Sequence, residues 1–332
     1  MLSRVADGLF WISRYIERAE NLGRVADVYL QVELDREVGR KVEWVAILQA
    51  SGALEDFEAA GLAPSVATVT EFLNSGQGNP NSITACFDRA RENARMIRDQ
   101  LTTEMWEELN RAWLELCGPA GKRLRKGGLP EYYREVRRAS HLFRGTTAST
   151  LSRGDGRDFL DLGMYLERAD ATSRMLEAQS LQSGGMGEEE RWAALLRSCS
   201  ARETYRAVHQ GPLEAKGVLG YLIHDPLFPR SLHHGIVQTG QIASRLATLK
   251  DQAEVMALVS GIRQKLDEAP LGKDAGELLA PFLDSWQKDL QGLAEWMRER
   301  IIGGKLELPE RSAWRSQQEQ QQQDWGGQAR WS

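Results

Sequence analysis

Residues 2–32 have the sequence LSRVADGLFWISRYIERAENLGRVADVYLQV, in which apolar and small side chains recur at alternating spacings of three and four. This seam consists of Leu2, Val5, Leu9, Ile12, Ile16, Ala19, Gly23, Ala26 and Leu30, and its spacing is typical of one face of an α-helix. A second apolar stripe contains Trp11, Tyr15, Leu22, Val25, Tyr29 and Val32. Two stripes on one helix predict a central helix over about residues 3–36. Its small residues Ala19, Gly23 and Ala26 would let neighbouring helices approach closely.

Helical spacing continues along the chain, and no run shows the period of two that is typical of strands. Further helices are expected at about 41–51, 65–74, 82–116, 130–152, 156–182, 188–208, 212–223, 231–267 and 274–302. Gly and Pro clusters, such as those at 76–80 and 118–121, separate them. The pattern predicts an all-α fold, built as a single large helical bundle.

The chain also repeats itself. YIERAE at residues 15–20 is matched by YLERAD at 165–170, and NPNSI at 79–83 is matched more weakly by FPRSL at 228–232. The offsets are 150 and 149 residues. We therefore predict one duplicated domain over residues 1–302, with pseudo-repeats of about 1–150 and 151–302. Residues 303–332 are rich in Gln, which predicts a disordered, low-complexity tail.

Composition and charge argue against several classes of protein. The 332 residues carry 42 basic and 47 acidic side chains, a net charge of −5, which argues against general nucleic-acid binding. No apolar run is long enough to span a membrane, and the first residues carry Arg4, Asp7 and Arg14 without a signal-peptide cleavage pattern. Of the 42 basic residues, 33 are Arg, whose planar group suits carboxylates and phosphates.

The three cysteines, Cys86, Cys117 and Cys199, form no C-x-x-C pair. This argues against a zinc ribbon or a dithiol redox site and favours reduced thiols that pack as small apolar side chains. We expect a cytoplasmic protein with no membrane partner and no nucleic-acid partner.

Charged side chains form a stripe on the first helix and again on its repeat. The first stripe contains Ser13, Glu17, Glu20, Arg24, Asp27 and Gln31, and the second contains Gly163, Glu167, Asp170, Arg174 and Glu177. Carboxylates three residues apart on a helix repel each other, so other groups must neutralise both acidic pairs.

Three interpretations of this stripe stay open. The first is an internal ion-pair network in which Glu20 pairs with Arg24 and Asp170 with Arg174. In that network Arg18 or Arg168 crosses between helices, and the 82–116 helix contributes Arg91, Arg95 and Arg98. The second is a surface that binds a polar substrate, a peptide or a partner protein. The third is a carboxylate metal site, but bundles with such sites usually carry Glu-x-x-His, which is absent, so we expect no metal.

No catalytic residue can be assigned. The chain lacks G-x-S-x-G, a Walker loop and H-E-x-x-H. His141 and His209 are isolated in the sequence, and the adjacent His233 and His234 point in different directions on a helix.

Several separated motifs resemble the bacterial alpha-E domain family over roughly residues 1–302. They are residues 1–7, Trp11, 13–15, 17–21, 79–83, 90–95, 98–101, 105–107, Asn110, 143–145 and 228–231. The resemblance implies a wholly helical fold and a gene beside that of a circularly permuted ATP-grasp protein, often with a transglutaminase-like peptidase. The two halves differ, since the second acidic pair is Glu167 and Asp170, and Gly76 stands where the second half has Asp225.

The duplicated charged stripe, the absence of a nucleotide motif and this resemblance together favour an accessory role. We expect a non-ATP-binding helical component of an ATP-grasp-dependent amide- or peptide-bond-forming system, which docks the ATP-grasp protein and presents a charged groove to a peptide or amino acid. ATP is expected on that partner, and this chain needs no cofactor. The alternatives are a stand-alone carboxylate-bundle metalloenzyme or transferase, and a purely structural scaffold. The candidate residues of the charged network are Arg14, Glu17, Arg18, Glu20, Arg24, Arg91, Glu92, Asn93, Arg95, Glu167, Arg168, Asp170, Arg174 and Arg230.

Overall fold

The computed structural model describes residues 1–35, 44–76, 78–181, 187–271 and 275–303. Within these ranges the chain forms fifteen α-helices and no β-strand, so the predicted all-α fold is confirmed. Residues 304–332, which make up nearly all of the predicted tail, lie outside the described residues.

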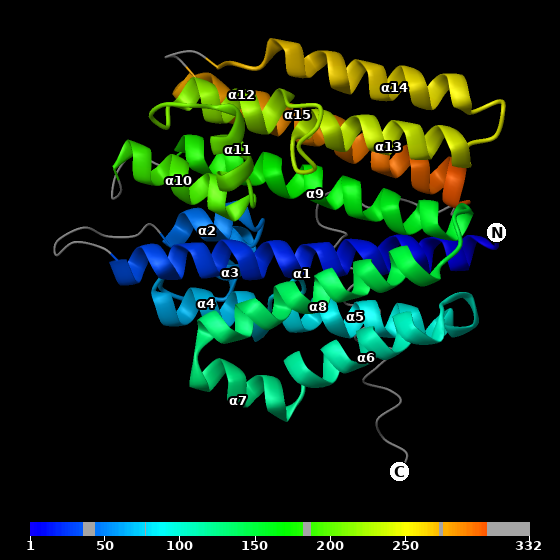
Figure 1. Cartoon of the computed structure of the whole chain (residues 1–332), viewed down its shortest axis with the longest axis horizontal. Coiled ribbons are helices and arrows are strands. Elements are labelled where there is room, and N and C mark those ends of the chain that lie inside the picture. The colour runs from blue at the N-terminus through cyan, green and yellow to red at the C-terminus, as the bar shows by residue number, and fades with distance from the viewer. Residues whose placement is uncertain (36–43, 77, 182–186, 272–274, 304–332) are drawn as a thin grey trace.

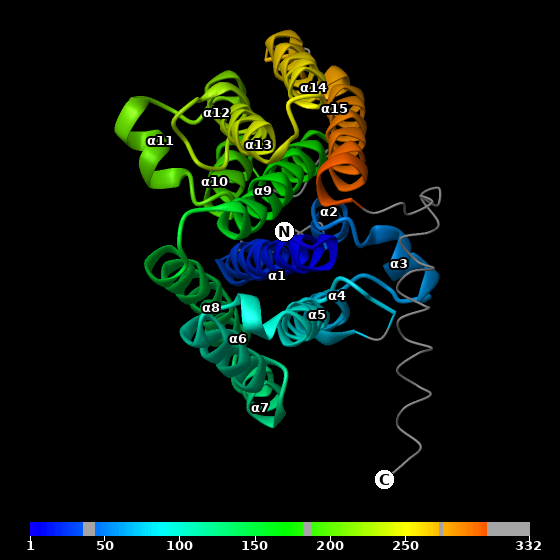
Figure 2. The same ribbon diagram turned by 90° about the vertical axis from the view of Figure 1, so that its right-hand side faces the viewer.

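Helix α1 (Ser3–Asp35) runs through the middle of the molecule (Figures 1 and 2). It packs against α5 (Ile83–Met96), α8 (Leu129–Thr150) and α9 (Asp155–Leu181). Most of both apolar stripes is buried, while Leu2 is exposed and Trp11 and Tyr15 are half-buried. The predicted central helix is therefore confirmed.

The other helices lie on the two sides of α1 (Figure 2). The first part of the chain adds α2 (Trp44–Ala50), α3 (Leu54–Ala59), α4 (Val66–Ser75), α6 (Thr103–Leu116) and α7 (Pro119–Gly127). The second part adds α10 (Glu188–Ser198), α11 (Arg202–Val208), α12 (Ala215–His224), α13 (Leu232–Leu246), α14 (Gln252–Lys265) and α15 (Ala275–Met297). Short turns of 3-10 or π helix cover Arg98–Gln100, Leu266–Glu268 and Arg298–Ile302.

The two parts of the chain pack in corresponding ways. Helix α1 contacts α5 and α8, and α9 contacts α13 and α15. Helix α6 likewise contacts α5 and α8, and α14 contacts α13 and α15. This is the arrangement that the sequence offset leads us to expect, and the duplication itself stays a prediction.

Small residues set the spacing around α1. A Cβ atom added at Gly163 of α9 would lie 2.3 Å from the carbonyl oxygen of Phe10, so only glycine allows this approach of the two backbones. A Cβ atom added at Gly23 would lie 3.1 Å from Val136 Cγ1 on α8. The close approach predicted at Gly23 is confirmed.

Three long helices expected from the sequence are interrupted. The stretch 82–116 breaks before α6, where the Thr102 side chain accepts a hydrogen bond from the Met105 backbone N–H at 3.2 Å and caps the new helix. The stretch 231–267 breaks between α13 and α14, and 188–208 breaks between α10 and α11 at Ser200, whose φ is 53°. Local caps and turns therefore override a helical spacing that continues across them.

Helices α3 and α7 were not expected. Gly118 and Pro119 had been interpreted as a break, but Pro119 occupies the first position of α7, where a missing N–H is harmless. The Ser residues that stand two positions after Pro80 and Pro229 cap the helices that follow. Ser82 Oγ accepts from Ala85 N at 3.3 Å and Ser231 Oγ accepts from His234 N at 3.0 Å. All three cysteines are free thiols.

Candidate functional site

Two Glu-Arg dipeptides exchange partners between α1 and α9. Arg168 donates from Nε and Nη2 to the two carboxylate oxygens of Glu17, at 3.0 and 3.1 Å. Arg18 donates in the same way to Glu167, at 2.6 and 2.9 Å. Both pairs are bidentate, and both carboxylates are buried. The exchange is what a twofold relation between two equivalent helices would produce.

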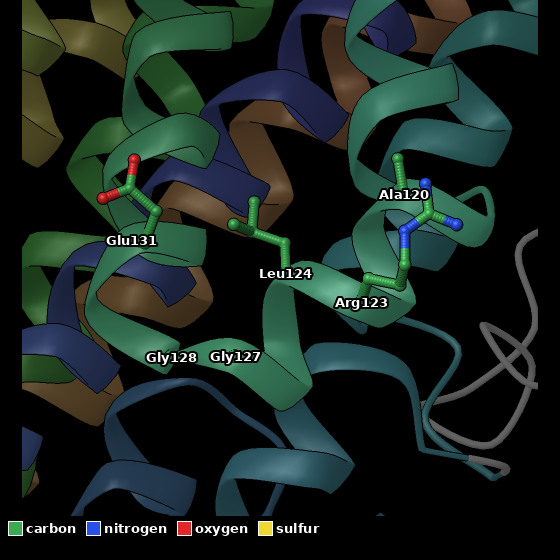
Figure 3. Close-up of a pocket in the computed structure, with 6 residues that line it drawn as sticks. All are labelled: Ala120, Arg123, Leu124, Gly127, Gly128 and Glu131. Atoms are coloured by element: carbon green, nitrogen blue, oxygen red, sulfur yellow. The ribbon is translucent and has the colours of Figure 1, made fainter.

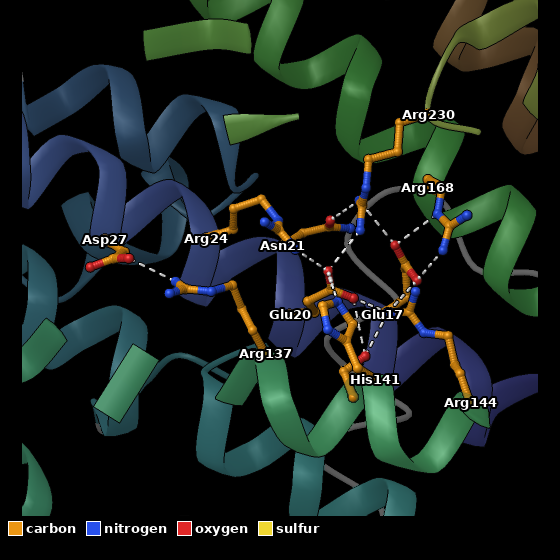
Figure 4. A network of polar contacts seen from close by, with 11 residues as sticks. Glu17, Glu20, Asn21, Arg24, Asp27, Arg137, His141, Arg144, Arg168 and Arg230 are labelled. Carbon is orange, nitrogen blue, oxygen red and sulfur yellow. Dashed lines mark hydrogen bonds and ion pairs between the residues drawn. The ribbon is translucent and has the colours of Figure 1, made fainter. Parts of the chain in front are cut away.

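The exchanged pair of Glu17 and Arg168 lies beside a second carboxylate, Glu20, and we call this group the Glu17–Glu20 centre (Figure 4). It comprises Glu17, Glu20 and the guanidinium groups of Arg24, Arg144, Arg168 and Arg230. Arg230, just before α13, lies 3.1 Å from Glu17 and 2.8 Å from Glu20. Arg144 of α8 lies 2.9 Å from Glu17 and also contacts Glu20. Arg24 lies 2.5 Å from Glu20, which is the predicted pair on α1.

Three further polar side chains surround Glu20 and Arg230. Ser140 Oγ donates to Glu20 Oε2 at 3.1 Å, and Asn21 Oδ1 accepts from Arg230 Nη1 at 2.7 Å. His141 Nε2 lies 3.5 Å from Glu20 Oε1 (Figure 4). His141 had been interpreted as isolated, and the structure corrects this, because α8 brings it beside a carboxylate far away in the sequence.

Positive charge is in excess at this centre, since four guanidinium groups face two carboxylates. Burial alone would raise the pKa of Glu17, but Arg144, Arg168 and Arg230 outweigh burial and hold that pKa well below its usual range. Burial, together with repulsion from Arg168 and Arg230, lowers the pKa of Arg144 to about 10. Burial, together with repulsion from Arg168 and Arg24, lowers the pKa of Arg230 to about 10. Burial and repulsion from Arg137 lower the pKa of Arg24 to about 10.

The exchanged pair of Glu167 and Arg18 is part of a second group, which we call the Glu167 centre and which holds a single carboxylate. Arg14 Nε donates to Glu167 at 2.8 Å, and Arg18 Nη1 donates to Asn81 Oδ1 at 2.6 Å. Burial opposes ionisation here too, but Arg18 and Arg14 lower the pKa of Glu167 to about 2. The predicted crossing of Arg18 and Arg168 between helices is thus present in both centres.

The predicted pair on α9 lies outside both centres. Arg174 Nε donates to Asp170 at 2.9 Å, and their side chains are 37% and 22% exposed. The structure therefore contains both predicted same-helix pairs, but only the one on α1 is part of a buried centre.

Four predicted residues on α5 are not brought to this network. Arg91 Nε donates to Asn110 at 2.8 Å, Arg95 Nε donates to Glu92 at 2.7 Å, and Asn93 is half-buried. Arg98, also suggested for the network, contacts the carbonyl oxygen of Leu101 instead. The four residues on α5 are turned away from the network, because α5 turns its apolar face toward α1.

Sequence reasoning missed the contribution of α8. Arg144 had been noted only as part of a family motif, and Ser140 and Arg137 had not been considered. Arg137 Nη1 donates to Asp27 of the charged stripe at 2.8 Å. A signal was present, because Arg137, Ser140 and Arg144 are spaced by three and four residues on an amphipathic helix.

The described part of the chain contains no group of three or more His, Cys, Asp and Glu side chains that could hold a metal ion. The four carboxylates of the metal-site interpretation, Glu17, Glu20, Glu167 and Asp170, each contact a guanidinium group. None of the described helices is both long enough and apolar enough to cross a membrane.

A pocket of about 460 Å³ lies at α7 and the start of α8 (Figure 3). Its lining consists of Ala120, Arg123, Leu124, Gly127, Gly128 and Glu131, and includes none of the predicted site residues.

The fold and the site together define, over the described residues, an all-helical protein in which Glu-Arg pairs join the two longest helices. A family described as "a predicted alpha-helical domain with a conserved ER motif", Alpha-E, has a sequence model that matches residues 1–301. The chain belongs to this family, as its motifs led us to expect. Glu17-Arg18 and Glu167-Arg168 are the Glu-Arg dipeptides that exchange partners.

Two curated relatives are the uncharacterized protein Mb2597 of Mycobacterium bovis and the uncharacterized protein MT2643 of Mycobacterium tuberculosis. Each is 24% identical to this chain over 267 residues, which cover 75% of this chain and 30% of the relative. The chain thus spans less than a third of the length of these relatives. No solved structure matches the chain.

Proposed function

We propose that this chain is a non-ATP-binding helical component of an ATP-grasp-dependent system that forms amide or peptide bonds in the cytoplasm. It docks a circularly permuted ATP-grasp protein, which carries the ATP, and it holds a peptide or amino-acid substrate through charged groups. A transglutaminase-like peptidase is a further partner in this proposal. The chain acts as an accessory subunit and uses no cofactor of its own.

The observation that carries the docking role is a surface on α5, α6 and the 3-10 turn between them, which we call the arginine–tryptophan face. It consists of Arg91, Arg95, Arg98, Trp106 and Trp113. The guanidinium carbon of Arg91 lies 4.3 Å from the ring centre of Trp113 and 5.8 Å from that of Trp106. Arg98 lies 5.7 Å from the Trp106 ring centre. Arginine and tryptophan are enriched at the energetic centres of protein interfaces, and stacking orders these side chains before a partner binds.

Co-expression tests the proposal. The chain carries the only tag and is produced with the circularly permuted ATP-grasp protein that the family resemblance places beside it. We expect the partner to co-purify and its ATP turnover to change. Absence of both co-purification and any effect on ATP turnover would contradict the proposal.

A matched pair of variants locates the docking surface. Arg95→Glu reverses a charge on the arginine–tryptophan face, where Arg95 is 63% exposed and pairs with Glu92. Arg138→Glu is the control, because Arg138 is 61% exposed and makes the same three-residue pair with Glu135 on α8. We expect the first variant to weaken the complex about tenfold and the second to leave it unchanged.

A structural scaffold is the second candidate, favoured by the burial of Glu17 and Glu167 among their guanidinium partners. A scaffold predicts that Glu17→Gln lowers stability and leaves the partner's activity unchanged once the chain is folded. If the complex forms but no substitution of a charged residue changes the partner's activity, the scaffold role replaces the substrate-binding role.

A further inference from the structure

The Glu17–Glu20 centre is short of negative charge. Its four guanidinium groups face two carboxylates, and adding the neighbouring pair of Arg137 and Asp27 leaves the difference unchanged. Two positive charges are therefore uncompensated among side chains that are largely buried. Because an unpaired buried charge is costly, such a centre is stabilised by an added anion.

Two buried hydrogen-bond donors at this centre lack a partner among the described residues. They are Arg24 Nε and Asn21 Nδ2. Each residue is already tied to the centre by its other polar atoms, since Arg24 Nη2 donates to Glu20 and Asn21 Oδ1 accepts from Arg230. Residues 21 and 24 are three apart on α1, so they are neighbours on one face of the helix.

Solvent reaches the centre along α8. His141 is 60% exposed while Glu20 beside it is fully buried, and the side chains of Arg144 and Arg24 are 25% and 14% exposed. Figure 4 shows His141 and Arg144 coming from α8 toward Glu20, opposite Arg24 and Asn21 of α1. The partly exposed donor side chains of this centre thus come from both helices, Arg24 from α1 and His141 and Arg144 from α8.

We infer that this edge of the Glu17–Glu20 centre binds a small oxyanion, a carboxylate or a phosphate, through Arg24, Asn21, His141 and Arg144. All four side chains can donate hydrogen bonds, and planar guanidinium groups suit the paired oxygens of both anions. The anion supplies the missing negative charge and the acceptor for the unpartnered donors. This site rests on the proposed function only for the identity of its natural ligand, as the acidic group of a peptide or amino acid.

Calorimetric titration of the purified full chain tests the site. Sodium phosphate and sodium acetate are titrated separately, with sodium chloride keeping the ionic strength constant. We expect saturable binding of at least one anion. Binding of phosphate alone assigns a phosphoryl ligand, and binding of acetate alone assigns a carboxylate ligand. If neither anion saturates, the inference is wrong.

Arg24→Gln should weaken this binding about tenfold, since it removes a charged donor. Arg174→Gln is the matched control, because Arg174 forms the corresponding pair with Asp170 on α9 away from the centre, and affinity should stay within about twofold. An equal loss in both variants would mean that the anion binds through general charge attraction, and would overturn the assignment.

His141→Gln provides a second test at a position exposed enough to tolerate substitution, with circular dichroism confirming the fold. We expect an affinity loss of about fivefold, and an unchanged affinity would overturn the route past His141. The titration does not involve the ATP-grasp protein. Anion binding without co-purification would therefore reject the docking role alone, and co-purification without anion binding would reject this site alone.

Discussion

The acid–arginine pairs Glu20–Arg24 and Asp170–Arg174 have the same spacing on α1 and α9 and lie 150 residues apart. Glu20 is fully buried and also contacts Arg144 and Arg230, whereas Asp170 is 22% exposed. The same local pattern therefore gives a buried charged centre in one part of the chain and a surface ion pair in the other.

The difference comes from the helices that pack alongside. Helix α8 places Ser140, His141 and Arg144 beside Glu20. At the positions 150 residues further on, α15 carries Leu290, Gln291 and Ala294. The loops differ as well, since Arg230 stands where the first part has Asn81. The Glu17–Glu20 centre and the Glu167 centre thus share the Glu-Arg exchange. Only the Glu17–Glu20 centre has two carboxylates surrounded by an excess of guanidinium groups.

Removing one carboxylate from the Glu17–Glu20 centre and one from the Asp170–Arg174 pair should give the largest contrast. Glu17→Gln leaves Arg144, Arg168 and Arg230 without their shared partner, so we expect a loss of about 3–5 kcal/mol in the free energy of unfolding. Asp170→Asn should cost less than about 1 kcal/mol, because its pair is partly exposed and contains a single carboxylate and a single guanidinium group. Urea denaturation at pH 7 measures both. Equal losses would remove the distinction between the buried Glu17–Glu20 centre and the partly exposed Asp170–Arg174 pair.

Acid should lower the free energy of unfolding through the Glu167 centre. The pKa of Glu167 is lowered to about 2 in the folded chain, so its contribution is complete above the ordinary glutamate pKa of about 4.5 and is lost as pH falls toward 2. The contribution is on the order of 3 kcal/mol. We expect the free energy of unfolding to decline between pH 5 and pH 2, and Glu167→Gln to flatten this decline. An unchanged pH profile in that variant would contradict the assignment to Glu167.

Double-mutant cycles should show whether the two exchanged pairs are equivalent. We expect coupling energies of about 1–3 kcal/mol for Glu17→Gln with Arg168→Met, and a similar value for Glu167→Gln with Arg18→Met. The cycle of Asp170→Asn with Arg174→Met should give about 0.5 kcal/mol. A large difference between the first two cycles would show that the symmetric geometry conceals unequal energetics.

The smallest effect on stability is expected at His141. His141→Gln changes a side chain that is 60% exposed, so the free energy of unfolding should stay within about 0.5 kcal/mol of the parent. Thermal and urea denaturation measure this. A larger loss would make His141 part of the supporting structure rather than the entrance to an anion site.

Local patterns in the sequence predicted what lies within one helix. The pairs Glu20–Arg24 and Asp170–Arg174 follow from the four-residue spacing, and the central place of α1 follows from its two apolar stripes. The Arg residues that cross between helices were expected because acidic pairs needed neutralisation. Their reciprocal pattern required the actual register of α1 against α9, which side-chain periodicity alone does not determine.

Contacts from distant helices were harder to predict. Arg144 reaches Glu17 and Glu20 only because α8 crosses α1 at their level, and nothing local to residue 144 indicates that crossing. Arg91 and Arg95 looked suitable by residue type, but the apolar face of α5 turns them away from the network. Residue type therefore indicates which side chains could join the network, and the packing of the helices determines which of them do.

The exchange between Glu17 and Arg168 joins residues 151 positions apart, and this separation matters during protein synthesis. At about 5–20 residues per second, a ribosome takes roughly 8–30 s to add Arg168 after Glu17. During that interval the carboxylates of α1 lack the guanidinium groups of α9 and Arg230, and α1 lacks the covering that α9 and α10 provide. We therefore expect the first helix to emerge early and to be among the last to reach its native surroundings.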